Sequence, residues 1–165
     1  MSTGMTVTLP GLLQVRTLLD DLLDPEVEVV PGDPTKTDDL PKTLVALYVD
    51  NSSRLVAVLG LDLPLAANAG ASLGLLPPGG AEDAVEEGAL TPPLEENVRE
   101  LCNIFASLLN REGGPHVKLH QVYPPGTEAP SDARAYLLAL GRREDVRVSI
   151  ARYGTGRLAL ALAEE

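Results

Sequence analysis

The sequence predicts an α+β fold in which an antiparallel sheet is covered on one face by long helices. Three observations lead to this prediction. Residues 94–110 repeat apolar side chains with the period of a helix. Residues 43–49 and 55–61 are β-rich runs on either side of Asp50-Asn51-Ser52-Ser53, a hairpin signal. Residues 117–163 hold further strand-like runs with no regular βα repeat, which favours antiparallel pairing.

The length of 165 residues and the hydrophobic content of 44% predict a single domain over residues 1–165, with a flexible N-terminus over residues 1–10. Spacing of apolar, Pro and Gly residues then assigns the first half of the chain. In order, we expect a helix over 11–23, a strand over 26–30, a loop over 31–41, the hairpin of 43–49 and 55–61, and a helix capped by Asp62 that runs to about Leu75.

The second half begins where Pro77-Pro78-Gly79-Gly80 ends that helix. A short acidic helix over 81–88 and the main helix, capped by Thr91 with Pro92 and Pro93 in its opening turn, come next. The remaining chain reads as four strands and a Pro-rich loop: strands over 117–123, 134–140, 145–151 and 157–163, and the loop over 124–131.

The main helix separates its side chains onto two faces. Its apolar stripe consists of Leu94, Val98, Leu101, Phe105 and Leu108. Its polar face consists of Glu96, Glu100, Asn103, Ser107 and Asn110. Glu100 and Asn103 are three residues apart, so they are neighbours on the polar face. A carboxylate and an amide held side by side on a helix can reach into another molecule.

Composition narrows the class of function. A net charge of −11 disfavours binding to nucleic acid, because nucleic-acid binding needs a basic surface. The same charge disfavours docking on an anionic membrane or insertion into it. The single cysteine, Cys102, excludes an internal disulfide and indicates a reducing compartment. Residues 1–10 do not resemble a signal peptide and no apolar run is long enough to span a membrane, so we expect a cytoplasmic protein.

The two halves of the chain contain a faint internal repeat. The segment from Val15 to Asp20 aligns with the segment from Val98 to Asn103, which places Thr17 opposite Glu100 and Asp20 opposite Asn103. Common origin of the two helices is one explanation. The general likeness of amphipathic helices is the other, and the sequence leaves both open.

Taken together, the chain resembles the CheC/CheX family of chemotaxis phosphatases, and CheX-like members most closely. The resemblance covers residues 11–163 in the order of elements, and it is most specific at Glu100-x-x-Asn103. It implies two related helix-plus-strand halves on one sheet, with the active pair on the second helix alone because the first helix offers Thr17 and Asp20.

The resemblance also implies a reaction, which is hydrolysis of the aspartyl phosphate on the receiver domain of a response regulator. Asn103 is expected to orient the attacking water and Glu100 to anchor the receiver through its lysine, with Glu96, Ser107 and Asn110 as further partner-binding residues. The chain then needs no metal or other cofactor of its own, because Mg²⁺ belongs to the receiver domain. Members of this family can also form homodimers.

Other interpretations remain open. Glu-x-x-Asn is a weak motif, and a merely solvated helix face explains it when the helix is considered alone. This chain also departs from the family by placing Ile104 beside the asparagine, at the flank of the site. The fold could instead serve as a non-catalytic adaptor, as it does in relatives of the flagellar switch, or as an unrelated α+β dimer that pairs through its sheet edges.

Several further residues fail as catalytic candidates. Cys102 lacks a phosphate-binding loop and falls at the edge of the apolar stripe, so it is expected to be a buried structural cysteine. His116 and His120 lack a third metal ligand. As nucleophiles, Ser52, Ser53 and Ser131 lack a base and an orienting acid, and residues 77–80 lack the Gly-Lys-Ser/Thr ending of a phosphate loop. A solvated helix face is expected for the acidic group Glu82, Asp83, Glu86 and Glu87.

Overall fold

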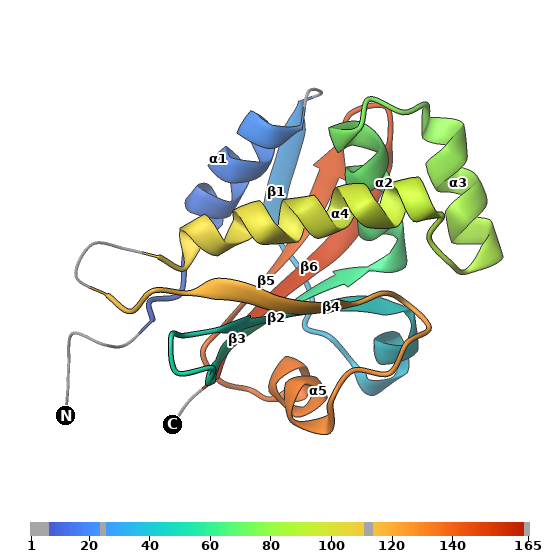
Figure 1. The fold of residues 1–165 in the computed structure, drawn as a ribbon. Helices are drawn as coiled ribbons and strands as arrows, with labels where there is room; N and C mark the ends of the chain where they lie inside the picture. Colours follow the sequence, from blue (N-terminus) through green and yellow to red (C-terminus); the bar gives the residue numbers. More distant parts are fainter. Residues whose placement is uncertain (1–6, 24–25, 111–113, 164–165) are drawn as a thin grey trace.

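The computed structural model describes residues 7–23, 26–110 and 114–163. Figure 1 shows a twisted sheet with α1, α2, α3 and α4 on one side and α5 on the other. The helices are α1 (Leu12–Leu22), α2 (Leu63–Leu73), α3 (Pro78–Glu87), α4 (Pro92–Phe105) and α5 (Ser131–Leu138), with 3₁₀ turns η2 (Thr37–Lys42) and η3 (Ala106–Leu108). The strands are β1 (Val27–Pro31), β2 (Thr43–Val49), β3 (Leu55–Asp62), β4 (Lys118–Tyr123), β5 (Arg143–Ile150) and β6 (Gly154–Leu162).

The six strands form one antiparallel sheet in the order β1-β5-β6-β3-β2-β4. This order reads the same from either end when β1, β2 and β3 are matched with β4, β5 and β6. The midpoint is the β3–β6 pair, where Leu59 lies opposite Leu160. Each half contributes one helix, α1 or α4, before its three strands. The strand order therefore has the symmetry that two related halves require.

One face of the sheet carries the main core. Alternate residues of the strands point to this face, as the period of two requires, and they meet the apolar stripes of α1, α2 and α4. Residues at the centre of this core include Leu44, Tyr48, Leu59, Leu160 and Phe105, each with essentially no exposed surface.

The opposite face is covered only in part, by α5. Here the structure corrects the prediction of a strand over residues 134–140, because this segment belongs to α5. Ala133 and Leu137, spaced i and i+4, pack on Val45 and Val58 of the sheet. Gly60 makes room for the helix, since a β-carbon there would lie 3.3 Å from the methyl groups of Leu137. Beside α5, Arg143 and Asp145 of β5 form an ion pair of 2.7 Å, and their side chains are only 9% and 12% exposed.

Other boundaries also differ from prediction. Residues 77–80 were expected only to end the preceding helix, but they also begin the next one. Pro77 is the N-cap of α3 and Pro78 is its first residue. The predicted loop over residues 31–41 contains the 3₁₀ turn η2. Within the predicted flexible N-terminus, Val7 is buried and its carbonyl accepts a hydrogen bond of 3.1 Å from Arg142 Nη2. Residues 1–6 of that prediction lie outside the described residues.

Candidate functional site

The helix α4 is seated by its predicted apolar stripe. Leu94, Val98, Leu101 and Phe105 are buried as expected, and Cys102 is buried beside them. The helix begins at Pro92 after Thr91, as predicted, but it ends at Phe105, where the chain tightens into η3. The tightening leaves Leu108 only half-buried, because 3₁₀ geometry rotates the following side chains away from the α-helical stripe.

Close contact with α2 fixes one side of α4. The α2 sequence is rich in alanine and glycine, so two backbones can approach each other. A β-carbon on Gly70 would lie 2.7 Å from the carbonyl oxygen of Leu94, a separation that only glycine permits. Asn97 of α4 donates a hydrogen bond of 3.0 Å to the carbonyl of Gly70. This contact therefore sets the axial position of α4.

A buried tyrosine fixes α4 from below. The hydroxyl of Tyr48, on β2, donates a hydrogen bond of 2.6 Å to the carbonyl of Cys102. The amide of Ala106 bonds to the carbonyl of Asn103, as in a 3₁₀ turn, so Tyr48 satisfies a carbonyl that this change of helix type leaves free. Burial, with a smaller contribution from Cys102, raises the pKa of Tyr48 well above its ordinary value. The anchor lies one residue before Asn103.

Glu100 and Asn103 are both exposed on the outer face of α4. Within the part of the chain that the structure describes, neither side chain makes a hydrogen bond or an ion pair, whereas the neighbouring Arg99 is held by Glu95 at 3.1 Å. The structure thus places the two predicted residues side by side on a fixed helix, with their polar atoms directed to solvent.

The other predicted partner-binding residues fall into two groups. Glu96 and Ser107 are exposed on the same face of the helix. Asn110 has a different environment, because its amide nitrogen donates to the carbonyls of Ala106 and Val117 at 3.0 and 2.7 Å. Its Oδ1 accepts a hydrogen bond of 2.7 Å from the Val117 amide. Asn110 therefore joins the end of η3 to the start of β4, and its amide is engaged within the chain.

The rejected candidates have environments that explain their rejection. Burial raises the pKa of the Cys102 thiol to about 12, so the reactive thiolate does not form near neutral pH. His116 and His120 are both exposed; His120 lies within β4 and His116 precedes it. In the described ranges, no group of three His, Cys, Asp or Glu residues is arranged to hold a metal ion.

The first half offers a comparable helix surface without the same residues. Val15 and Leu19 of α1 are buried, as Val98 and Cys102 are in α4, and Thr17 and Asp20 are exposed. The two helices are not side by side, because α1 packs on β1 whereas α4 packs on α2 and β4.

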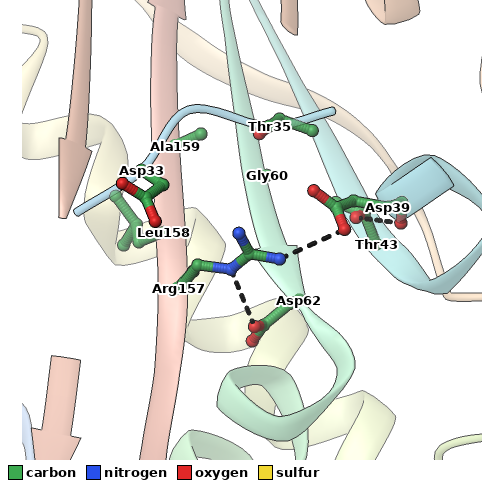
Figure 2. Close-up of a pocket in the computed structure, with 9 residues that line it drawn as sticks. All are labelled: Asp33, Thr35, Asp39, Thr43, Gly60, Asp62, Arg157, Leu158 and Ala159. Atoms are coloured by element: carbon green, nitrogen blue, oxygen red, sulfur yellow. Dashed lines mark hydrogen bonds and ion pairs between the residues drawn. The ribbon is translucent and has the colours of Figure 1, made fainter. Parts of the chain in front are cut away.

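Sequence reasoning missed a polar cluster on the opposite face of the sheet (Figure 2). Arg157 of β6 lies between Asp39 and Asp62, with N–O distances of 3.2 and 3.7 Å. Asp62 also caps α2 by accepting the Leu65 amide at 3.0 Å, and burial raises the pKa of its carboxyl while that amide and Arg157 oppose the shift. The adjoining cavity of about 20 Å³ has room for one water. We interpret the cluster as a tether for the segment that contains η2.

Solved structures with the same arrangement of elements were found. The middle domain of FliM from Helicobacter pylori superposes with a TM-score of 0.60 at 8% identity, over 92% of this chain and 84% of that chain. The FliM middle domain from Vibrio alginolyticus superposes with a TM-score of 0.57 at 12% identity, over 90% of this chain and 86% of that chain. A chain of the CheX–CheY–BeF₃–Mg²⁺ complex from Borrelia burgdorferi superposes with a TM-score of 0.51 at 16% identity, over 94% of this chain and 100% of that chain.

This chain has the fold shared by CheX and the FliM middle domain. The predicted α+β class and the predicted resemblance to CheX-like proteins are therefore confirmed at the level of fold. No protein-family model and no curated relative matches the sequence. No described helix of the CheX-fold domain has both the length and the apolar character needed to cross a bilayer.

Proposed function

We propose that this chain is a CheX-like phosphatase that hydrolyses the aspartyl phosphate of a response-regulator receiver domain. One observation carries the proposal: Glu100 and Asn103 are exposed, adjacent and without partners in the described chain, on a helix fixed by Tyr48 and by the α2 contact. A helix face that is merely exposed to solvent does not need hydrogen bonds that hold its backbone directly beneath the exposed residues.

The reaction requires positioning more than covalent chemistry. Water attacks phosphorus opposite the acyl oxygen, the P–O bond to the aspartyl carboxylate breaks, and inorganic phosphate leaves. The Asn103 amide offers both a donor and an acceptor, so it can hold the water in line. Glu100 pairs with a lysine of the receiver and fixes the helix against it. The Mg²⁺ that neutralises the phosphoryl charge comes with the receiver.

A second function has its own support. FliM middle domains superpose with higher TM-scores than the chain from the CheX–CheY complex does. One fold can host different functions, so this likeness favours a non-catalytic adaptor as the alternative. The two functions differ in one measurable property, which is whether the phosphate of a bound receiver decays faster.

Phosphate release from purified phosphorylated receiver domains tests the proposal. We expect the wild-type chain to accelerate release and Asn103→Ala to lose at least 100-fold of that acceleration, because a misaligned water loses the benefit of orientation. The matched control is Asp20→Ala on α1, which removes an exposed polar side chain from the comparable helix and should leave the rate unchanged.

Two results would count against the proposed roles. Receiver binding without any acceleration identifies the adaptor instead. An equal loss of rate on substituting Glu96 and Asn103 shows that the outer face acts only by charge or contact, and not through a water held by Asn103.

A further inference from the structure

Leu75 follows α2 in a backbone conformation that leucine adopts at a cost. Its φ is +57°, in the left-handed region, and its side chain is 74% exposed. Among the described residues, Leu75 is the one large hydrophobic residue that combines a positive φ with an exposed side chain. Either feature alone is ordinary, but together they mean that the strain is not offset by burial.

The conformation belongs to a Schellman motif that ends α2. The amide of Leu76 donates to the Ala71 carbonyl at 2.8 Å, and the amide of Leu75 donates to the Ser72 carbonyl at 3.1 Å. In this motif the left-handed residue is usually glycine, because a β-carbon there is strained. The same molecule uses glycine in this conformation at the end of α3, where Gly88 has φ +80°. The fold therefore gives no reason for leucine at position 75.

The position of Leu75 supplies a reason. The preceding residue, Gly74, touches α4, since a β-carbon on it would clash with the amide group of Asn97. Asn97 is three residues before Glu100, a rise of about 4.5 Å along the helix. A standard protein interface covers about 800 Å² of each partner. An interface of this size centred on Glu100 and Asn103 is wide enough to reach the end of α2 that lies against Asn97, where Leu75 follows Gly74.

The fully exposed side chains on the outer face of α4 include no apolar anchor, since Ile104 at the flank of this face is only half-exposed. Glu96, Glu100, Asn103 and Ser107 are all polar. Interfaces draw most of their affinity from a few apolar or aromatic side chains that become buried on binding. Polar contacts at the centre of an interface orient the partner, and a neighbouring hydrophobic residue adds affinity. An exposed leucine beside the outer face of α4 would supply this apolar contact.

We propose that Leu75 is an apolar contact for the receiver domain that docks on α4. This inference rests on the proposed function, because the occupant is the same phosphorylated receiver. Glu100 and Asn103 determine the chemistry, and Leu75 determines how tightly the receiver is held. The strain at φ +57° is kept because the side chain is buried only in the complex.

The test measures stability and affinity on the same variants. The probe is a receiver domain carrying beryllofluoride and Mg²⁺, chosen as one whose phosphate the wild-type chain removes. We expect Leu75→Gly to raise the thermal unfolding midpoint by about 2–4 °C, because the strain is released, and to weaken receiver binding at least tenfold. Leu75→Asn, which also tolerates a positive φ, should weaken binding similarly. Leu75→Met should retain binding.

The matched control is Leu140→Asn, which removes the most exposed large hydrophobic residue, at 93%, from the turn after α5. It should leave receiver affinity unchanged. Wild-type affinity in both Leu75→Gly and Leu75→Asn overturns the inference alone. A change in self-association with unchanged receiver binding also overturns it, and identifies a second copy as the occupant. If no receiver is bound or dephosphorylated by the wild type, the proposed function fails and the inference fails with it.

Discussion

The helices α1 and α4 occupy comparable places in the two halves of the sheet, but only α4 is anchored at its outer pair. Both expose two polar side chains over a buried apolar stripe, Thr17 and Asp20 in α1 and Glu100 and Asn103 in α4. Beneath Asn103, Tyr48 bonds to the backbone of α4, whereas within the described residues no side chain from another element donates a hydrogen bond to the α1 backbone. The proposed site on α4 therefore combines an exposed polar pair with a fixed backbone, whereas α1 has only an exposed polar pair.

Transferring the motif tests this difference with the largest expected effect. In an Asn103→Ala background, Thr17→Glu and Asp20→Asn place the E-x-x-N pair on α1. We expect the rate of receiver dephosphorylation to stay at least about 100-fold below wild type, since small displacements of an orienting group cost this much. Phosphate release measures it. A graft that restores the full rate would show that anchoring is irrelevant.

Removing the anchor itself should cost stability. Tyr48→Phe leaves the Cys102 carbonyl buried and unsatisfied, and we expect the free energy of unfolding to fall by about 1–3 kcal/mol. Chemical denaturation measures the change. The control is Tyr123→Phe on β4, because the Tyr123 hydroxyl makes no hydrogen bond within the described residues. An equal loss in both variants would mean that the Tyr48 bond has no special role.

The core beneath α4 should also be sensitive to alkaline pH, unlike the core beneath α1. Burial raises the folded-state pKa of Cys102 to about 12 and that of Tyr48 well above 10, whereas Leu19 of α1 does not titrate. Because both folded pKa values exceed the unfolded ones, this stability is fully present below about pH 9. It is lost as pH rises toward and through the folded pKa values, by up to about 1.4 kcal/mol per pH unit for each group.

Denaturation curves between pH 8 and 11 measure this slope. Cys102→Ala should flatten the slope whatever its effect on stability at pH 8, because it removes one of the two titrating groups. An unchanged slope would contradict the assignment to Cys102.

The smallest effect is expected in α2, which supports α4. The Ser72 hydroxyl is buried and has no hydrogen-bond partner among the residues that the structure describes. Ser72→Ala removes an unsatisfied polar group, so we expect the free energy of unfolding to rise by less than about 1 kcal/mol. Thermal unfolding measures the gain. A clear loss of stability would show that the hydroxyl does have a partner in solution.

Local patterns in the sequence were sufficient to predict most of the fold. The stripe of α4, the β2–β3 hairpin and the Asp62 cap of α2 all depend on residues close together in the chain, and all were confirmed. The segment of α5 was predicted wrongly, because its apolar residues fit both a strand and a helix. Contact of Ala133 and Leu137 with the far face of the sheet, a tertiary effect, decides in favour of a helix.

The site was predictable only in its exposed residues. Helical spacing placed Glu100 and Asn103 together on the outer face, but the bond from Tyr48, 54 residues away from Cys102, has no local signal. The same is true of Arg157 between Asp39 and Asp62, and of the internal bonds of Asn110. The left-handed conformation of Leu75 is a local feature, but it could not be predicted because sequence rules assign that conformation to glycine.

The palindromic strand order has a consequence for how the domain unfolds. The first strand of each half sits at the far edge of the other half, β1 beside β5 and β4 beside β2. Neither half can complete its own sheet, so fragments cut between α3 and α4 should be unstructured apart and should recover the fold only when mixed. Because each half depends on a strand of the other, we expect the whole domain to unfold in a single cooperative transition.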